Sequence, residues 1–141
     1  MSYKIVIENN RIAVEEERGK YKINLNERFL QFAVDVIEYS FSLPKLREFD
    51  SIKYQLSKSA TSIGANYTES QAGSFAEFKQ RIQICLREAR ETYYWLKIIQ
   101  RLDVENNKEN KMNLDQLLKE ANEIQLILGA ISSKIKNKTK P

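Results

Sequence analysis

The sequence predicts an all-α protein, an antiparallel up-down-up-down four-helix bundle with a short N-terminal arm or β-hairpin. Two observations predict this fold class: four long segments carry apolar residues at three-four spacing, and polar junctions separate them. At 141 residues the chain has room for one domain. We expect the arm over residues 1–25, the bundle over residues 26–137 and a basic tail over residues 138–141.

The N-terminal segment has a different pattern from the rest. The runs KIVIE and RIAVE alternate β-branched and other residues and are joined by Asn9-Asn10, which is typical of a tight hairpin. A two-stranded hairpin is only marginally stable by itself. Two interpretations therefore stay open: a frayed arm, or a hairpin that packs on a neighbour.

The first two helices are predicted from their apolar stripes and end signals. Asn26 is the expected N-cap of a helix that reaches about Phe41, and Pro44 stops it. A second helix is expected from about Arg47 to Gln71, with small residues around Gly64 that permit close approach of a neighbouring helix. The expected inner faces are Phe29, Ala33, Val36, Ile37 and Ser40, then Ile52, Leu56, Ala60, Ile63, Tyr67 and Ser70.

The third helix is the longest predicted element, from Phe75 to about Leu102. We expect Gly73 to be the left-handed C-cap of the preceding helix, Ser74 to be the next N-cap and Glu77 to complete a capping box. Its core seam repeats at three-four spacing. The seam consists of Phe75, Phe78, Ile82, Cys85, Ala89, Thr92, Leu96 and Ile99.

The fourth helix is expected to close the bundle after a polar, exposed loop over residues 103–112. Asn113 is the predicted N-cap. The predicted seam is Leu114, Leu117, Ala121, Ile124, Leu128, Ile131 and Ile135.

Composition excludes several kinds of catalytic site. The chain has no His and one Cys, so imidazole-based triads, His-containing zinc sites and thiolate cages are excluded. Its glycines form no phosphate-binding loop. We therefore predict no enzyme activity, no catalytic residues, no cofactor and no metal. No run is apolar enough to cross a bilayer and no secretory signal is evident, so we expect a cytoplasmic protein without membrane contact.

One carboxylate cluster is a hypothesis to exclude. Glu69, Glu88 and Glu91, with Asn66 nearby, could converge between the second and third helices for acid–base work or a hard metal. Carboxylates among arginines on helices more often make structural ion pairs.

A second stripe on the third helix predicts an oligomer interface. It is mostly apolar and adjoins the core seam, and Trp95 is its natural anchor. The alternative is that this helix lies centrally within one bundle. The stripe consists of Ile84, Glu88, Glu91, Trp95, Ile98 and Leu102.

The remaining face of the third helix predicts contact with RNA or DNA. It has no acidic residue, and its cations can follow a phosphate backbone while Tyr94 offers a ring for base stacking. The alternative is a solvated face in which Arg87 pairs with Glu91. The face carries Gln80 and Gln83, and we assign nucleic-acid binding to Arg87, Arg90, Tyr94, Lys97 and Arg101, together with Lys134, Lys136, Lys138 and Lys140 of the tail.

Charge segregation supports an anionic partner. Residues 73–102 carry six cations and three anions, and residues 134–141 carry four cations and no anion. These segments hold +3 and +4 of a chain total of +4, which leaves −3 for the rest. Basic residues at a helix C-terminus also stabilise the helix dipole, so this observation has a second explanation.

The middle of the chain carries two distinctive segments. They are SIGANYTE over residues 62–69, and Phe78, Lys79, Ile82, Arg87-Glu88-Ala89, Glu91-Thr92 and Tyr94-Trp95-Leu96. These segments resemble the second-helix and third-helix signatures of the bacterial proteins encoded within intervening sequences of 23S ribosomal RNA genes. The likeness covers about residues 26–136, and the N-terminal arm lies outside it.

The resemblance implies a four-helix bundle that assembles as a ring-like homopentamer. It is similar in this respect to the accessory variability proteins of diversity-generating retroelements, which bind nucleic acid and a reverse transcriptase. Two functions are therefore expected as alternatives: a homo-oligomeric binder of RNA or DNA, or a protein-interaction scaffold that recognises an acidic protein partner.

Overall fold

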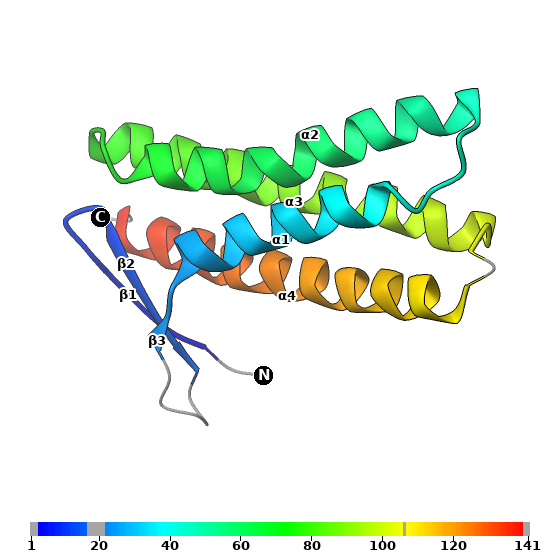
Figure 1. Ribbon diagram of the computed structural model, residues 1–141. Helices are drawn as coiled ribbons and strands as arrows, with labels where there is room; N and C mark the ends of the chain where they lie inside the picture. Colours follow the sequence, from blue (N-terminus) through cyan, green and yellow to red (C-terminus); the bar gives the residue numbers. More distant parts are fainter. Residues whose placement is uncertain (1–2, 17–21, 106, 140–141) are drawn as a thin grey trace.

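A computed structural model describes residues 3–16, 22–105 and 107–139 of the chain. Its elements are three strands, β1 (Tyr3–Glu8), β2 (Arg11–Glu16) and β3 (Lys22–Ile23), followed by four helices (Figure 1). The helices are α1 (Leu25–Ser40), α2 (Arg47–Ser70), α3 (Phe75–Leu102) and α4 (Lys108–Thr139).

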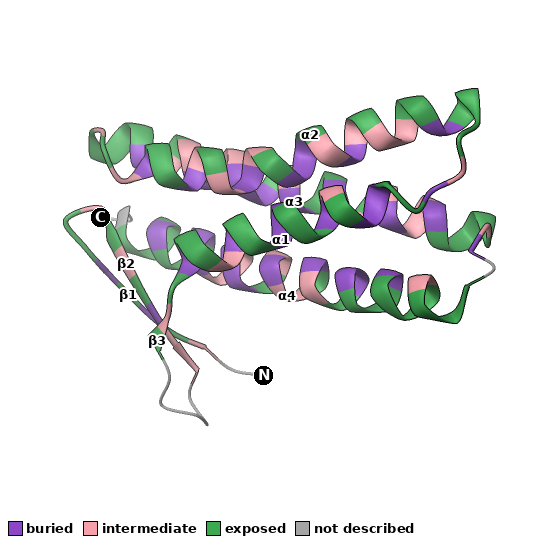
Figure 2. Ribbon diagram, in the orientation of Figure 1, coloured by how far each residue is buried: buried purple, intermediate pink, exposed green. Residues whose placement is uncertain are grey.

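The four helices form an antiparallel bundle in up-down-up-down order, which confirms the predicted fold class (Figure 1). Each helix packs against the next along the chain, and α4 returns beside α1. Buried residues line the inward faces of the helices and exposed residues cover the outside (Figure 2). The core is therefore one continuous apolar cluster running the length of the bundle.

The N-terminal segment is a hairpin that packs on its own chain. Asn9 and Asn10 both have positive φ angles, 48° and 61°, as a two-residue turn requires. β1 pairs antiparallel with β2, and β3, which the sequence did not predict, adds a short third strand. Ile5, Ile7 and Val14 are buried in the core cluster, and β1 contacts α4. The frayed-arm interpretation was wrong for the described strands.

The start of α1 and the approach of α2 depend on two small features. The N-cap is Asn24, whose side chain accepts from the Glu27 backbone N–H at 3.1 Å, so the predicted cap at Asn26 was wrong by two residues. A Cβ at Gly64 would lie 3.3 Å from the Phe29 Cβ. Glycine thus lets α1 and α2 approach closely, as predicted.

The turn between α2 and α3 forms as predicted only on its α3 side. The Ser74 hydroxyl accepts from the Glu77 backbone N–H at 3.2 Å, which confirms this N-cap. Gly73 does not have a positive φ, and the C-cap residue of α2, Gln71, has a right-handed conformation, so the left-handed C-cap was wrong. The atoms nearest to a Cβ built on residue 73 belong to the flexible Glu77 side chain.

The connection between α3 and α4 is shorter than predicted. α4 begins at Lys108, and Asn107 accepts from the Glu109 backbone N–H at 2.8 Å, so Asn113 is an exposed residue inside the helix and not its cap. The loop is not wholly exposed either. Glu105 is 6% exposed and accepts a hydrogen bond from the Tyr39 hydroxyl at 2.6 Å, which ties the loop to α1.

Candidate nucleic-acid interface

Packing on both sides fixes which faces of α3 reach the surface. Its core seam is buried from Phe78 to Ile99 as predicted, and only Phe75, at the first turn, is partly exposed. Arg81 donates to the Asn66 side chain on α2 at 2.9 Å, and Gln83 donates to the Ser132 hydroxyl on α4 at 2.5 Å. The strip of α3 between these two contacts on its outer side is therefore free of the rest of the bundle.

Four basic residues and one tyrosine on this outer strip form what we call the basic ridge: Arg87, Arg90, Tyr94, Lys97 and Arg101. All are exposed except Lys97, which is half-buried and donates to the Gln100 side chain at 2.8 Å. Within the described part of the chain, ion pairs join only Arg28 to Glu120 and Lys111 to Asp103. The ridge cations therefore have no carboxylate partner among those residues, and their charge is available to an anion.

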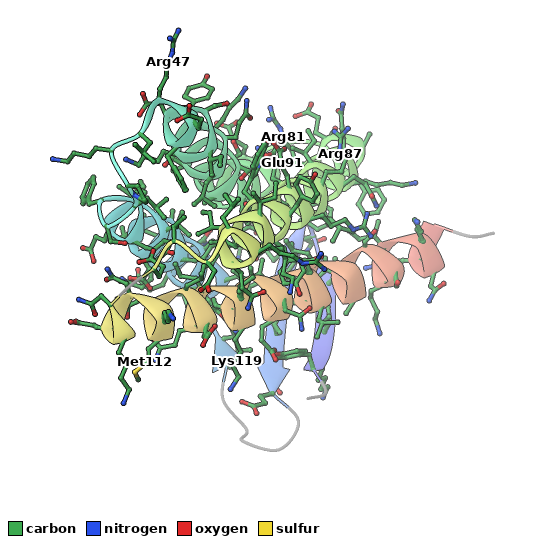
Figure 3. The ribbon with its side chains drawn as sticks, turned by 90° about the vertical axis from the view of Figure 1, so that its right-hand side faces the viewer. Arg47, Arg81, Arg87, Glu91, Met112 and Lys119 are labelled. Atoms are coloured by element: carbon green, nitrogen blue, oxygen red, sulfur yellow. The ribbon has the colours of Figure 1, made fainter. Side chains whose placement is uncertain are left out.

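The expected pair between Arg87 and Glu91 does not form. Glu91, which is labelled with Arg87 in Figure 3, instead accepts a hydrogen bond from the Trp95 indole N–H at 3.3 Å. An exposed arginine one helical turn from a carboxylate gains little from pairing with it in water. The interpretation of the ridge as an ordinary ion-pair network was wrong for this pair.

The second stripe of α3 is partly covered. Ile84, Glu88, Trp95 and Ile98 are half-buried, whereas Glu91 and Leu102 are exposed. Trp95 packs partly against the bundle core. Its ring lies edge-on to that of Tyr94, with 5.7 Å between the ring centroids. α3 lies against both α2 and α4, so packing within one chain accounts for the partial burial of these residues. It does not cover Leu102, which remains 50% exposed.

An apolar hollow of about 430 Å³ lies where the basic ridge meets the second stripe. Ile98 and Leu102 supply its apolar side, and Tyr94, Lys97 and Arg101 supply an aromatic and cationic side. Such a surface can bury an apolar or aromatic group while holding negative charge beside it.

The lysine tail is mostly helical. α4 extends to Thr139, and Lys134, Lys136 and Lys138 are exposed on it, whereas Lys140 lies outside the described residues. Lys138 donates to the Ile7 backbone carbonyl of β1 at 2.7 Å. This lysine has a structural contact to the sheet, so its assignment to nucleic-acid binding is weaker than that of the ridge.

The carboxylates between α2 and α3 do not form a metal site. The described residues contain no group of three or more His, Cys, Asp or Glu side chains placed to hold a metal ion. Partial burial, and then the neighbouring Glu91 charge, raise the pKa of Glu88 above its ordinary value. The Asn66 side chain already accepts a hydrogen bond from Arg81 and donates one to the Ser62 backbone carbonyl.

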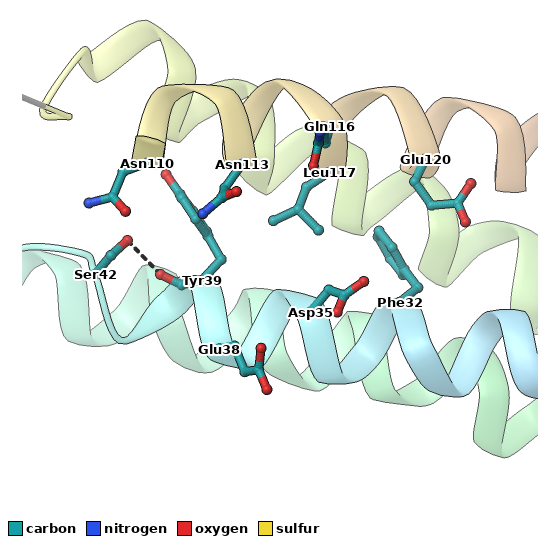
Figure 4. Close-up of a pocket in the computed structure, with 10 residues that line it drawn as sticks. All are labelled: Phe32, Asp35, Glu38, Tyr39, Ser42, Asn110, Asn113, Gln116, Leu117 and Glu120. Carbon is teal, nitrogen blue, oxygen red and sulfur yellow. Dashed lines mark hydrogen bonds between the residues drawn. The ribbon is translucent and has the colours of Figure 1, made fainter. Parts of the chain in front are cut away.

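A polar groove of about 430 Å³ lies between α1 and α4 (Figure 4). Asp35 and Glu38 from α1 and Asn113, Gln116 and Glu120 from α4 line it over a floor of Phe32 and Leu117. Glu120 is already paired with Arg28 at 2.6 Å. This side of the molecule is acidic where the α3 side is basic.

One exposed apolar stripe was missed by the sequence analysis. On α1, Leu30 is 58% exposed and Val34 is 40% exposed, and Phe41 directly after it is 75% exposed, the largest value among the exposed large apolar residues of the described chain. Ile37, which was predicted on the inner face, is only half-buried and completes a four-three-four spacing with these residues beside the buried face. The same periodicity used for the core could have identified this α1 stripe.

Comparisons with known proteins identify similar chains. A model of the family described as 23S rRNA-intervening sequence protein matches residues 22–130. Among solved structures, the chain is similar to a protein of unknown function from the S23 ribosomal protein family of Bacteroides thetaiotaomicron. The TM-score is 0.66 and the identity is 31%, over 77% of this chain and 97% of that one. No curated protein matches. No helix in the described ranges is long and apolar enough to span a membrane.

Proposed function

Because the chain belongs to the 23S rRNA-intervening sequence protein family, we propose that it is a non-enzymatic, homo-oligomeric bundle that binds RNA or DNA through the basic ridge of α3. The observation that carries this proposal is the set of exposed ridge cations without a carboxylate partner within the described chain. No residue of the ridge is acidic, so phosphates meet cations along this face, and Tyr94 can stack on an unpaired base.

The absence of evident catalytic chemistry in the described residues supports a binding role. The chain has no His, and Cys85 is buried, with burial raising its thiol pKa to about 12. A thiol that keeps its proton at neutral pH is a poor nucleophile. Five copies, the number that the family resemblance implies, would repeat the ridge around a ring and so bind a long polyanion through several sites at once.

A protein scaffold is the second candidate function. The hollow beside Tyr94 combines an apolar floor with Lys97 and Arg101, which suits an aromatic anchor on an acidic protein as well as a nucleobase. The two candidates differ in whether isolated nucleic acid binds.

The test measures binding of fluorescent single-stranded RNA and DNA against salt concentration. Replacing Arg87, Arg90 and Lys97 together by Gln should weaken binding and flatten the logarithmic salt slope by about 2, since each lost phosphate contact contributes roughly 0.7 for single strands. The matched control replaces the exposed cations Lys22, Lys108 and Lys119 by Gln, which removes the same charge elsewhere. We expect the control to bind nearly as the original protein does.

Equal losses in both triple variants would show that only net charge matters and would overturn the ridge assignment. Failure of the original protein to bind at low salt would instead favour the protein scaffold. Circular dichroism and light scattering on the same samples establish that fold and mass are unchanged.

A further inference from the structure

Two exposed surfaces on opposite sides of this bundle carry complementary patterns. On the outside of α1, the side toward α2 is apolar and the side toward α4 is acidic. On the outside of α3, the side toward α2 carries the second stripe and the side toward α4 carries the basic ridge. The apolar residues of the α1 stripe are Leu30, Val34, Ile37 and Phe41, and the acidic flank is Asp35 and Glu38.

We infer that the α1 stripe is the docking surface for the outer face of α3 on a second copy of this chain. This inference rests on the self-association in the proposed function. It adds the surface that α3 contacts on the other copy, because the sequence identified an interface only on α3. Helices α1 and α3 point the same way and lie across the bundle from each other (Figure 1). A second copy placed beside the first with parallel axes therefore brings the α1 stripe onto the second stripe and the acidic flank beside the ridge.

The two surfaces also match in height along the bundle. Phe29 is level with Gly64, and Cys85 contacts the Ile63 carbonyl at 3.4 Å, so positions 29 and 85 lie at similar heights. Position 41 follows position 29 by 12 residues, and position 97 follows position 85 by 12 residues. At 1.5 Å per residue, the rise along the helix axis is about 18 Å in both cases. Phe41 is therefore level with the apolar hollow that Ile98 and Leu102 line.

Phe41 is the anchor of this interface. Its ring is 75% exposed in the single chain, and the hollow offers apolar side chains and an aromatic neighbour at the same height. Burying a phenylalanine ring in such a place supplies much of the binding energy of an interface. By the same register Glu38 is level with Tyr94, so an acidic residue faces the ridge beside the anchor.

The arrangement is head to tail and leaves part of the ridge exposed. Each copy uses two different faces, so contacts repeat from copy to copy and close into a ring when the rotation allows. Arg90 follows Gln83 at heptad spacing on the α4 side of α3, farthest from the docked α1 stripe. This cation remains available to nucleic acid, whereas Lys97 and Arg101 line the hollow that Phe41 enters.

The experiment blocks each face separately and measures mass by light scattering over a range of protein concentrations. Phe41→Lys places a cation against Lys97 and Arg101, and Leu102→Glu places a carboxylate on the apolar side of the hollow, where the Phe41 ring of the neighbour docks. Each variant should reduce the mass to that of a monomer, 16.5 kDa, and weaken association at least about 30-fold. Leu126→Lys is the matched control, since Leu126 is 53% exposed on α4, outside both faces, and its mass should be unchanged.

Mixing the two blocked variants gives the decisive result. A head-to-tail interface predicts that the Phe41→Lys and Leu102→Glu chains form one pair and stop there, because each retains only one working face. A Phe41→Lys variant that keeps the original mass, a mixture that stays monomeric, or a monomeric original protein would each overturn the inference. Binding of nucleic acid by a monomeric original protein would leave the ridge proposal standing, so the two failures can be told apart.

Discussion

Helices α1 and α3 have the same kind of inner face and opposite outer faces. Phe29 on α1 and Leu96 on α3 are both fully buried in one core. On the outside, Asp35 and Glu38 give α1 negative charge, whereas the ridge gives α3 positive charge. The inner faces determine that the chain folds as a bundle, and the outer faces determine what the bundle can bind.

The difference shows that the inner and outer positions of one helix in a small bundle affect separate properties, stability and binding. Core positions are constrained by packing density, so they vary little in chemistry between the helices. Outer positions contribute little to the stability of one chain, and their charge can differ freely. A mutation on the inner face should therefore change stability, and a mutation on the outer face should change association.

The largest effect is expected from the inner faces. Phe29→Ala should lower the free energy of unfolding by about 3–5 kcal/mol and Leu96→Ala by about 2–5 kcal/mol, because each leaves a cavity in a core position with 0% exposure. Urea denaturation followed by circular dichroism measures both values. Leu126→Ala, at an exposed position of α4, is the control and should cost less than about 0.5 kcal/mol. A cost below 1 kcal/mol for either core variant would show that the two helices do not share one core.

A smaller effect is expected at the polar contact between α1 and the loop after α3. Tyr39→Phe removes the donor to the buried Glu105 carboxylate and should cost about 1–3 kcal/mol near neutral pH. Burial, and then Glu105, raise the pKa of Tyr39 above its ordinary value of 10.0. The unfolded chain loses this proton near pH 10 while the folded protein keeps it, so stability is retained below pH 10 and lost as pH rises above it.

The pH profile separates this contact from ordinary packing. The free energy of unfolding of Tyr39→Phe should fall less steeply above pH 10 than that of the original protein, measured by urea denaturation at several pH values. The remaining decline comes from groups such as Tyr67, whose pKa burial raises to about 12. Parallel profiles in both proteins would contradict a protonated, buried Tyr39.

The smallest effect is expected at the helix starts, where α1 and α3 again use the same device. Asn24→Ala and Ser74→Ala should each cost about 1 kcal/mol, because each removes the side-chain acceptor of one N-terminal backbone N–H. Leu46→Ala at the start of α2 is the control, since that residue makes no capping hydrogen bond. Thermal unfolding measures all three. A loss of stability in only one of the two cap variants would mean that water replaces the side-chain acceptor at the other cap.

Local patterns were enough to predict the helices and most of their inner faces. The three-four spacing from Phe78 to Ile99 follows directly from 3.6 residues per turn, and the Ser74 cap needs only a side chain three residues before Glu77. The start of α4 was predicted too late because Lys108–Met112 lacks an apolar stripe, although Asn107 caps it. Local propensity also could not show that Gly73 lies outside the left-handed region.

The candidate site was predictable only in part. The ridge residues follow from spacing and charge, but whether Arg87 pairs with Glu91 depends on where Trp95 places its indole N–H. The α1 stripe is visible in the sequence as a periodicity, yet nothing in the sequence shows which of two apolar stripes on one helix is buried. That choice is made by the neighbours of the helix.

The sequence by itself determined the helical bundle, the order of its helices and the segregation of positive charge onto α3, because these depend on periodicity and composition along one segment at a time. Only the tertiary structure decided that the hairpin packs on α4, that Glu105 is buried against Tyr39, and that Phe41 lies level with the hollow on α3. Those features join residues far apart in the chain, and their relative positions are fixed by how four helices pack together.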